Sequence, residues 1–511
     1  MSAPVSAASS PPELGPLGHT RRRLLGRRPR SLLGRVPRQG WLCALVACLN
    51  AVCWSFITPP FQVPDEPDHY AYVEQLALTG ELPSSEASEN YPADEALTLR
   101  DLGTYRVRLQ PENPAVYSHE EEQRIAQDLA LARSAPVNAT GTGGVAAGEP
   151  PLYYALELIP YELGGTVLDR IQLMRLMSAV LAGLTALCVF LFIREVLPRE
   201  PWAWSVGGIA VALTPMLGFM SGGVTPEAML YAVSAATFFC LARTFRRGLT
   251  PRRAVAIAAV VAIGLFTKLN FVGFLPAIAL GMVVLVKRLR GRSRVMVYRT
   301  LSVAFIVIVA LAVAAVTSGA ISHTQIGSPG ASFHNVVGHG SLLGRVNYVW
   351  QFFLPRLPGT PNDFPGIFTT RQIWFNGLVG LFGWLDTTFP NWVYDAALIP
   401  ATTMALLLIA ALIADRGALR ERAGELLTYV LMACGLLILI GSASYVGFPE
   451  IGGAYAESRY LLPLLALMGA AVALAARGAG RWGPTVGVLI LVLFLAHDIF
   501  SQLQVIARYY G

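Results

Sequence analysis

The sequence predicts an all-α integral membrane protein with about eleven transmembrane helices. Of the 511 residues, 54% are hydrophobic and only 14% are charged. Apolar runs of about eighteen or more residues, long enough to cross a bilayer, recur along the chain. The formal net charge of +7 comes from arginines between these runs. They lack the interleaved aromatic residues typical of nucleic-acid binding, so no nucleic-acid partner is expected.

One membrane domain is predicted over residues 40–506. Residues 1–39, rich in Pro, Ser, Gly and Arg, are expected to be a disordered basic cytoplasmic tail, and residues 507–511 a short outer C-terminus. Two long outer loops, 59–169 and 321–391, are expected to carry helices that lie along the membrane interface. The expected spans are 41–58, 171–193, 202–221, 226–241, 254–267, 271–286, 300–320, 392–414, 426–444, 460–476 and 486–500.

Basic residues predict the orientation of the chain in the membrane. If the N-terminus lies in the cytoplasm, the inside segments hold most of the 39 basic residues, although the outside segments are much longer. This distribution is the positive-inside pattern. We therefore expect a multi-pass protein of the plasma membrane, with both long loops and the C-terminus outside.

A short acidic stretch directly follows the first apolar run. Prolines stiffen its backbone, and Asp65, Glu66, Asp68 and His69 then fall within five positions. Carboxylates next to a membrane are costly unless they have a function or a partner. Asp65 also suits the N-cap of an amphipathic helix that ends at Gly80. Both interpretations stay open at this point, because a cap also fixes the position of a carboxylate.

Ionisable residues occur at the outer ends of the expected spans and not at their midpoints. They are Arg175, Glu227, Lys268, Asp395, Arg459 and Asp498. A charge at the bilayer centre costs at least ~3 kcal/mol. Long basic side chains can reach the nearer interface, but that does not explain why the inner halves of the spans lack such residues. A polar cavity at the outer leaflet does.

Several function classes lack support in the sequence. Secondary transporters usually carry ionisable residues and broken helices near the midplane, and ion channels carry a filter motif. Neither pattern is found. The Walker A, G-x-S-x-G and H-E-x-x-H motifs are also missing. An activated donor would therefore reach the site from the membrane or from outside.

Four segments resemble a bacterial family of multi-spanning membrane proteins, the domain of unknown function 2142. These segments are residues 60–69, 149–154, 382–386 and 458–463. That family is similar in layout to the C-type membrane glycosyltransferases (GT-C), which carry an acidic pair at the position of Asp65 and Glu66. GT-C enzymes transfer sugars from polyprenyl-phosphate carriers. Relatives usually have His or Lys where this chain has Glu149.

The resemblance implies a glycosyltransferase that moves a sugar from a polyprenyl-phosphate donor to a cell-envelope glycan or lipid at the outer leaflet. A fixed carboxylate can deprotonate the acceptor hydroxyl, which is worth about 10²–10⁴-fold, and cations stabilise the leaving phosphate. We expect Asp65 to be the base. Glu66 and Asp68 are expected to position it or to help hold a divalent cation, Mg²⁺ or Mn²⁺, with Asp65 and Glu66 as the metal ligands.

The other candidate residues are expected to bind substrate. They are Asp68, His69, Glu149, Arg175, Lys268, Asp386, Arg459 and Tyr460. Among them, Arg175, Lys268 and Arg459 are the expected partners of the phosphate. The alternative function is a lipid-linked-sugar flippase or transporter without catalysis, which should tolerate Asp65→Asn better than an enzyme would.

Overall fold

The structure is a computed structural model. It describes residues 36–83, 91–108, 110–113, 118–132, 144–289, 291–317, 342–363, 370–451 and 457–511. Most of the predicted cytoplasmic tail and part of the second outer loop lie outside these residues. Residues 38–511 belong to one compact unit, and its first helix, α1 (Arg38–Ile57), begins two residues before the predicted start of the membrane domain at residue 40.

Helices make up nearly all of the described chain, which confirms the predicted all-α membrane fold. Eight described helices are long and apolar enough to cross a membrane, or nine if one bent pair is counted as a span. The eight are α1, α7 (Val167–Val196), α10 (Pro226–Arg247), η3 with α12 (Leu269–Lys287), α17 (Asn391–Ala414), α19 (Ala423–Ile451), η5 with α20 (Ser458–Gly478) and η6 with α21 (Gly480–Tyr510).

The predicted count of eleven spans is not confirmed. Two of the expected spans correspond to helices that are neither among the eight candidate spans nor part of the bent pair. One is α11 (Pro251–Thr267), which has only 17 residues. The other is α13 (Gly291–Thr317), whose side chains are described only as far as residue 310.

The span predicted at residues 202–221 is broken into α8 (Pro201–Ala212) and α9 (Pro215–Ser221), which are bent by 54°. Pro215 has no N–H and cannot continue the hydrogen-bond ladder of α8. Next to the break, Asn50 Nδ2 donates to the carbonyl oxygen of Ala212 at 3.1 Å. The expectation that the spans contain no broken helix is therefore wrong for this segment.

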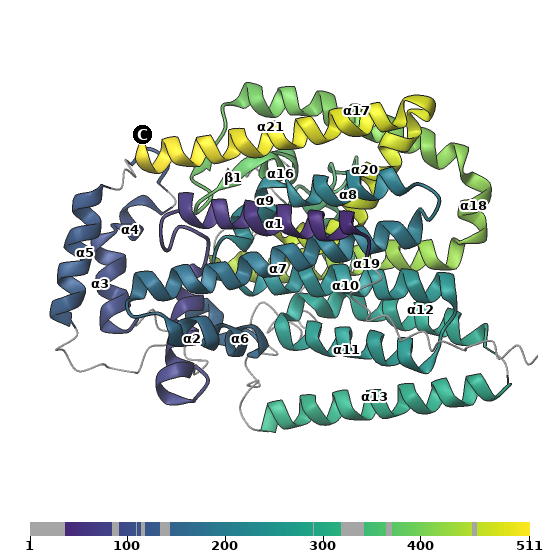
Figure 1. The fold of residues 1–511 in the computed structure, drawn as a ribbon, viewed down its shortest axis with the longest axis horizontal. Coiled ribbons are helices and arrows are strands. Elements are labelled where there is room, and N and C mark those ends of the chain that lie inside the picture. The colour runs from purple at the N-terminus through teal and green to yellow at the C-terminus, as the bar shows by residue number, and fades with distance from the viewer. Residues whose placement is uncertain are drawn as a thin grey trace, which may run out of the picture. The chain divides into compact units, whose positions relative to one another are not determined.

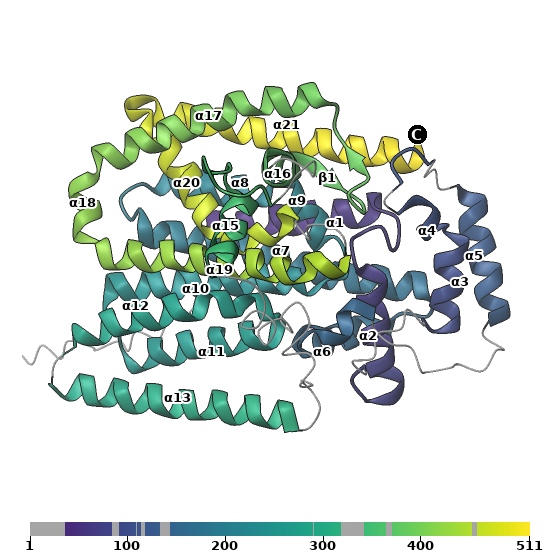
Figure 2. The same ribbon diagram turned by 180° about the vertical axis from the view of Figure 1, so that it is seen from behind.

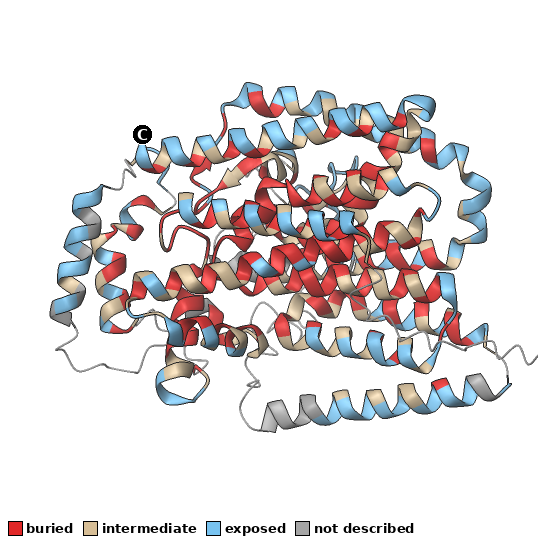
Figure 3. Cartoon of the chain, viewed as in Figure 1, coloured by how far each residue is buried: buried red, intermediate tan, exposed pale blue. Residues whose placement is uncertain are grey.

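The long helices of residues 38–511 run roughly parallel to one another (Figures 1 and 2). α7 packs against both α1 and α10, and the buried residues concentrate on α7 and α10 in the middle of the bundle (Figure 3). In α17, by contrast, only 6% of the residues in its apolar stretch are buried. An apolar helix with so little protein contact suits a position that faces lipid.

The first outer loop gathers its helices at one end of the long helices (Figure 1). They are α2 (Glu66–Thr79), α3 (Ala93–Asp101), α4 (Thr104–Val107), α5 (His119–Ala132), η2 (Gly144–Gly148) and α6 (Leu152–Leu163). α2 is the predicted short helix, and its end at Gly80 is confirmed. Gly80 adopts φ 71° and donates from its N–H to Leu76 O, as in a glycine C-cap.

The described part of the second outer loop contains a small β-hairpin that the sequence analysis did not predict. β1 (Leu381–Phe382) pairs with β2 (Thr387–Thr388) in antiparallel register. Gly383 and Leu385 have positive φ in the turn, and Trp384 Nε1 donates to Phe61 O at 3.1 Å. The hairpin therefore ties this loop to the acidic stretch. The helices around it are α15 (Leu342–Phe353), η4 (Arg371–Asn376) and α16 (Gly377–Gly380), and α18 (Arg416–Glu421) follows α17.

The last helix continues past the predicted end of its span. α21 (Gly483–Tyr510) includes most of residues 507–511. Its fully buried Tyr509 donates from Oη to Gln62 Oε1 at 3.3 Å. Arg508 donates to the carbonyl oxygens of Gln110 and Asn113 in the first outer loop. The end of α21 is thus packed against the acidic stretch and its loop.

Candidate functional site

The acidic stretch forms a tight turn that leads into α2. Asp65 precedes the first helical residue and has φ 61° and ψ 8°, in the left-handed region, and its side chain makes no capping hydrogen bond. Asp and Asn enter this region more readily than most other residues. Of the two interpretations that the sequence left open, a capping hydrogen bond from the Asp65 side chain is therefore not found. Its carboxylate is available for other contacts.

Arg459 holds the Asp65 carboxylate. Its Nη2 lies 2.7 Å from Asp65 Oδ2 and 3.5 Å from Tyr460 Oη. On the other side, Arg459 Nε lies 2.5 Å from Glu457 Oε2. The Arg459 side chain is 3% exposed and that of Asp65 is 18% exposed. Asp65 Oδ1 has no hydrogen-bond partner within the described part of the chain. One oxygen of Asp65 is thus oriented and the other is free to accept a proton.

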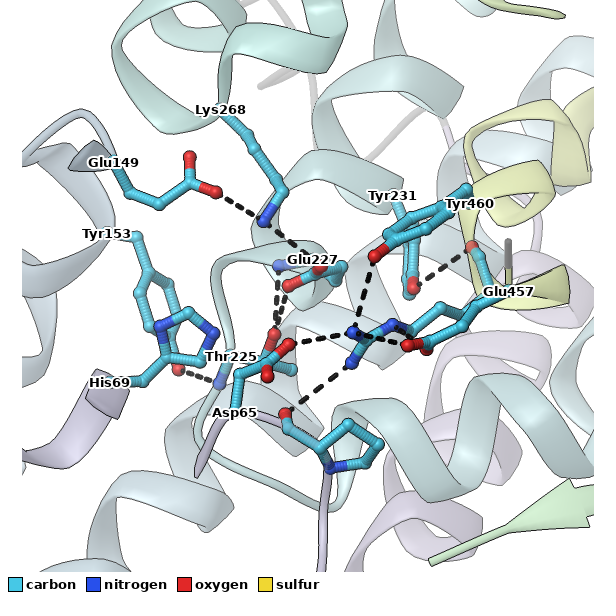
Figure 4. Close-up of polar contacts among 12 residues, drawn as sticks. Asp65, His69, Glu149, Tyr153, Thr225, Glu227, Tyr231, Lys268, Glu457 and Tyr460 are labelled. Carbon is cyan, nitrogen blue, oxygen red and sulfur yellow. Dashed lines mark hydrogen bonds and ion pairs between the residues drawn. The ribbon is translucent and has the colours of Figure 1, made fainter. Parts of the chain in front are cut away.

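Lys268 forms the second part of the site. It lies between α11 and η3, with Nζ 2.7 Å from Glu149 Oε1 and 3.0 Å from Glu227 Oε1 (Figure 4). Glu227 also accepts from Thr225 Oγ1, at the start of α10. The N–H of Thr225 donates to Tyr153 Oη at 2.8 Å. Lys268 is therefore held between a loop carboxylate and a helix-terminal carboxylate.

His69 lies beside both groups and is neutral. Its Nδ1 is 2.9 Å from Tyr154 Oη, and Tyr154 stacks on Tyr72 with ring centroids 3.7 Å apart. Burial lowers the pKa of His69 to about 4, and the charges of Glu227, Lys268, Asp65 and Arg459 contribute in both directions. The site therefore contains two cations, Lys268 and Arg459. They face four carboxylates, which are Asp65, Glu149, Glu227 and Glu457.

Glu66 and Arg175 form a separate, fully buried pair. Arg175 donates from Nε and Nη2 to both oxygens of Glu66, at 2.8 and 2.6 Å. Its remaining N–H groups donate to the carbonyl oxygens of Ser55, Thr58 and Pro59. Glu66 also accepts from the N–H groups of Phe61 and Val224. Because the contacts of both side chains are saturated, neither has a free group to offer a substrate.

The two cations and four carboxylates named above form what we call the acid–base cluster. Two other candidate residues have partners outside it. Asp68 accepts from Tyr91 Oη at 2.7 Å. Asp386 belongs to the β1–β2 turn, where Thr387 Oγ1 donates to its Oδ1 at 3.3 Å. Asp65, His69, Glu149, Lys268, Arg459 and Tyr460 are the candidates that the structure brings together (Figure 4).

The residues present do not fit the predicted divalent cation. The Glu66 carboxylate is occupied by Arg175 and two backbone N–H groups, whereas Asp65 is turned toward Arg459. Among the described residues, no group of three or more His, Cys, Asp or Glu side chains is arranged to hold a metal ion. We therefore derive no chemical step through a metal.

Sequence reasoning missed two central carboxylates as site residues. Glu227 was noted as a charge at a span end and as part of the segment Thr225-Pro-Glu227, which resembles a short family turn, but it was not assigned to the site; Glu457 was not considered. Glu457 directly precedes the segment 458–463 that carries part of the family resemblance. Glu227 stands two residues after Thr225, which caps α10. A carboxylate next to a motif and one in the first turn of a helix are both signals that could have found them.

The fold and the site define a helical membrane protein with a buried acid–base cluster near the ends of its long helices. The family model described as "Predicted membrane protein (DUF2142)" matches residues 48–468. The chain therefore belongs to the DUF2142 family. A search of curated proteins gives no match.

Solved structures show weak similarity to this chain. ArnT from Cupriavidus metallidurans in the apo state is 13% identical, with a TM-score of 0.45 over 93% of this chain and 74% of that one. The same protein bound to undecaprenyl phosphate is 12% identical, with a TM-score of 0.40 over 93% and 76%. The Archaeoglobus fulgidus oligosaccharyltransferase tethered with an acceptor peptide is 12% identical, with a TM-score of 0.42 over 92% and 55%. This chain thus spans about half the length of the oligosaccharyltransferase, and similarity at this level assigns no activity.

Proposed function

We propose that the protein is a membrane glycosyltransferase that uses Asp65 as its general base. The observation that carries this proposal is the Asp65 carboxylate, which Arg459 orients through one oxygen and leaves free at the other. A base of this kind must be fixed, partly accessible and able to reach a hydroxyl proton. Asp65 meets the first two conditions in a site that is otherwise mostly buried.

The reaction follows from this assignment. The hydroxyl oxygen of the acceptor attacks the anomeric carbon of the donor sugar and loses its proton to Asp65 Oδ1. The bond between that carbon and the donor phosphate oxygen breaks, and the lipid phosphate leaves with the bonding electrons. Negative charge then grows on the leaving phosphate, so cations aimed at it would stabilise the transition state.

Lys268 and Arg459 are the cations that we propose for this role. Both are nearly buried, with side chains 9% and 3% exposed. A charge-assisted hydrogen bond is stronger in such surroundings than in water. Each cation pairs with a residue of the first long loop, Arg459 with the proposed base Asp65 and Lys268 with Glu149 (Figure 4). A polyprenyl phosphate would place its headgroup next to these cations and its tail in lipid, and the acceptor would be a cell-envelope glycan or lipid.

We propose that Glu66 and Arg175 support the site and do not contact the substrate. Their pair fixes residues 55–61 and the turn at Val224 through backbone hydrogen bonds. A charged pair with every donor occupied can hold a backbone in one conformation. In this assignment, Glu66 is not a catalytic residue and Arg175 is not a phosphate partner.

The test is transfer by purified protein from a panel of polyprenyl-phosphate sugars. We expect transfer from at least one donor, and transfer should be lost in Asp65→Asn while donor binding is kept. Asp395→Asn is a matched control, because the Asp395 side chain is 63% exposed. Lipid-linked-sugar movement across vesicles, without transfer and unaffected by Asp65→Asn, would contradict the enzyme proposal and favour a flippase.

A further inference from the structure

The acid–base cluster has more carboxylates than cations. Arg459 is shared by Asp65 and Glu457, and Lys268 is shared by Glu149 and Glu227. If all six groups are ionised, the cluster carries a net charge of −2 before any ligand binds. A phosphate would add negative charge to a buried site that already has an excess of it, which is unfavourable in a low-dielectric environment. Either a bound proton or an additional cation must compensate this excess of negative charge.

The position of Glu457 makes it the group best placed to take that proton. Its carboxylate contacts Arg459 at two atoms, with Nε–Oε2 at 2.5 Å and Nη2–Oε1 at 3.2 Å. It therefore occupies the Nε–Nη2 edge of the guanidinium and shares Nη2 with Asp65. Its side chain is 13% exposed, so a proton can reach it from solvent. Asp65 needs to stay ionised to act as the base.

The surroundings of Glu457 disfavour its charge. The groups that face it are Arg459 and Tyr460 on its own segment, Asp65 from the turn before α2, Glu227 and Tyr231 from α10, and Lys268 from the start of η3. Burial is the main reason that the pKa of Glu457 is raised to about 7; Arg459 and Lys268 oppose this rise, and Asp65 and Glu227 add to it. A small change in the local charge therefore decides whether Glu457 is ionised at neutral pH.

We propose that Glu457 is a proton-linked positioning residue: when ionised it occupies Arg459, and when protonated it releases the guanidinium edge to the donor phosphate. This inference rests on the proposed function. One proton moves from solvent to the Glu457 carboxylate as the phosphate binds, Arg459 stays charged throughout, and no other bond changes. Glu457 does not contact the reacting atoms, because it acts through Arg459.

The expected result is a pH dependence of donor affinity. A polyprenyl phosphosugar is a phosphodiester and has no second acidic proton, so its own charge stays constant. Its Kd should be nearly flat below about pH 7 and should rise about tenfold per pH unit above it. In Glu457→Gln the side chain is permanently neutral, so the Kd should stay low and flat across the range. If Glu457 had only a structural role, the substitution Glu457→Gln would not remove the pH dependence of the Kd.

The experiment measures binding of the phosphosugar to the full chain in detergent, with a chelator present, between about pH 5.5 and pH 8.5. Glu81→Gln, at an exposed loop carboxylate, is the matched control and should keep the slope. A pH-independent Kd in the parent protein would overturn the inference. The inference would also be overturned if the pH dependence of the Kd survived in Glu457→Gln, or if it disappeared in Glu149→Gln instead. Binding that requires added Mg²⁺ would overturn it as well.

The two proposals fail in different ways. If the parent protein binds no polyprenyl phosphosugar at any pH, with or without Mg²⁺, the proposed function itself is contradicted. If it binds the donor and transfers the sugar but shows none of the expected pH dependence, only the role of Glu457 is wrong.

Discussion

Arg459 Nη2 lies 2.7 Å from Asp65 Oδ2, although the two residues are 394 positions apart in the chain. The same guanidinium approaches the carbonyl oxygen of Pro64 at 3.5 Å and the carboxylate of Glu457. One side chain from the start of the η5–α20 span therefore orients the acidic turn of the first outer loop. This relationship motivates the first two predictions.

Asp65→Asn should abolish transfer without unfolding the protein. Asn is tolerated in the left-handed region about as well as Asp, so the turn at φ 61° is kept. The amide cannot accept the hydroxyl proton, and turnover should fall by about 10²–10⁴-fold. Turnover, donor binding and thermal unfolding should be measured on one preparation. Unchanged turnover would exclude Asp65 as the base.

Arg459→Lys should weaken donor binding or turnover nearly as much as Arg459→Ala. A lysine ammonium is a point charge and cannot reproduce the flat, multidentate contacts of a guanidinium, which here join Asp65 and Glu457. Loss of one charge-assisted hydrogen bond of about 1.5–3 kcal/mol corresponds to roughly 10- to 150-fold. Lys268→Ala should have a comparable effect. Donor titrations check this, and parent-like binding in all three variants would show that these cations do not hold the phosphate.

Glu66→Ala and Arg175→Ala should each destabilise the protein strongly. Each change leaves the other member of the pair as an uncompensated charge at a site that is 0–1% exposed, which typically costs about 3–5 kcal/mol. The measurements are folded yield and unfolding in detergent. A variant that is as stable as the parent but cannot bind the donor would instead favour the substrate role predicted from the sequence.

Stability should fall as pH rises toward 8, because of a carboxyl group on α2. Glu74 accepts from Tyr161 Oη at 3.0 Å, lies 3.8 Å from Arg170, and is near Asp94 and the fully buried Glu95. Burial raises its pKa to about 8, so the folded state binds a proton that the unfolded state has already lost. The free energy of unfolding should decrease by up to about 1.4 kcal/mol per pH unit between about pH 4.5 and pH 8.

The check on Glu74 is thermal unfolding across that pH range. Glu74→Gln should reduce the slope, since an amide does not titrate, and Glu81→Gln should leave it unchanged. A parent slope of zero, or an increase of stability with pH that Glu74→Gln removes, would contradict the assignment.

Reporters at Gly80 and Gly511 should lie on the same side of the membrane, and reporters at Gly248 and Gly480 on the opposite side. The contact of Tyr509 with Gln62 joins the C-terminal helix to the first outer loop. The positive-inside pattern predicts that this shared side is outside. A cytoplasmic signal at Gly80 would reverse the orientation and place the site away from an external acceptor.

Patterns that repeat along the chain were readable from the sequence, and long-range pairings were not. Apolar run length predicted most of the spanning helices, and Gly80 marked the end of α2. No local pattern indicates that Arg175 would be saturated by Glu66 and three carbonyl oxygens, since those partners are more than 100 positions away. Composition likewise hides the break at Pro215, because both flanking segments are apolar.

The same limit applied to the site. Charges at the span ends indicated polar groups there, and the structure pairs Lys268 and Arg459 with carboxylates; that these ends face outward stays a prediction. The carboxylates that share these cations depend on how helices pack, so Glu227 and Glu457 were not assigned. Asp386 lies in the β1–β2 turn, where Thr387 donates to it, and its substrate role stays a prediction.

The packing of Arg508 and Tyr509 against the first outer loop has a consequence for biogenesis. Gln62 is made early in synthesis, but its contact with Tyr509 can form only after α21 has been made. The partner of Asp65 is likewise made 394 residues later. In a nascent chain, Glu66 of this turn can pair with Arg175 early, whereas Asp65 has no ion-pair partner until Arg459 has been made. Synthesis interrupted before residue 459 therefore leaves Asp65 without its ion pair, and a bulky fusion that displaces the last turn of α21 removes the contact of Tyr509 with Gln62.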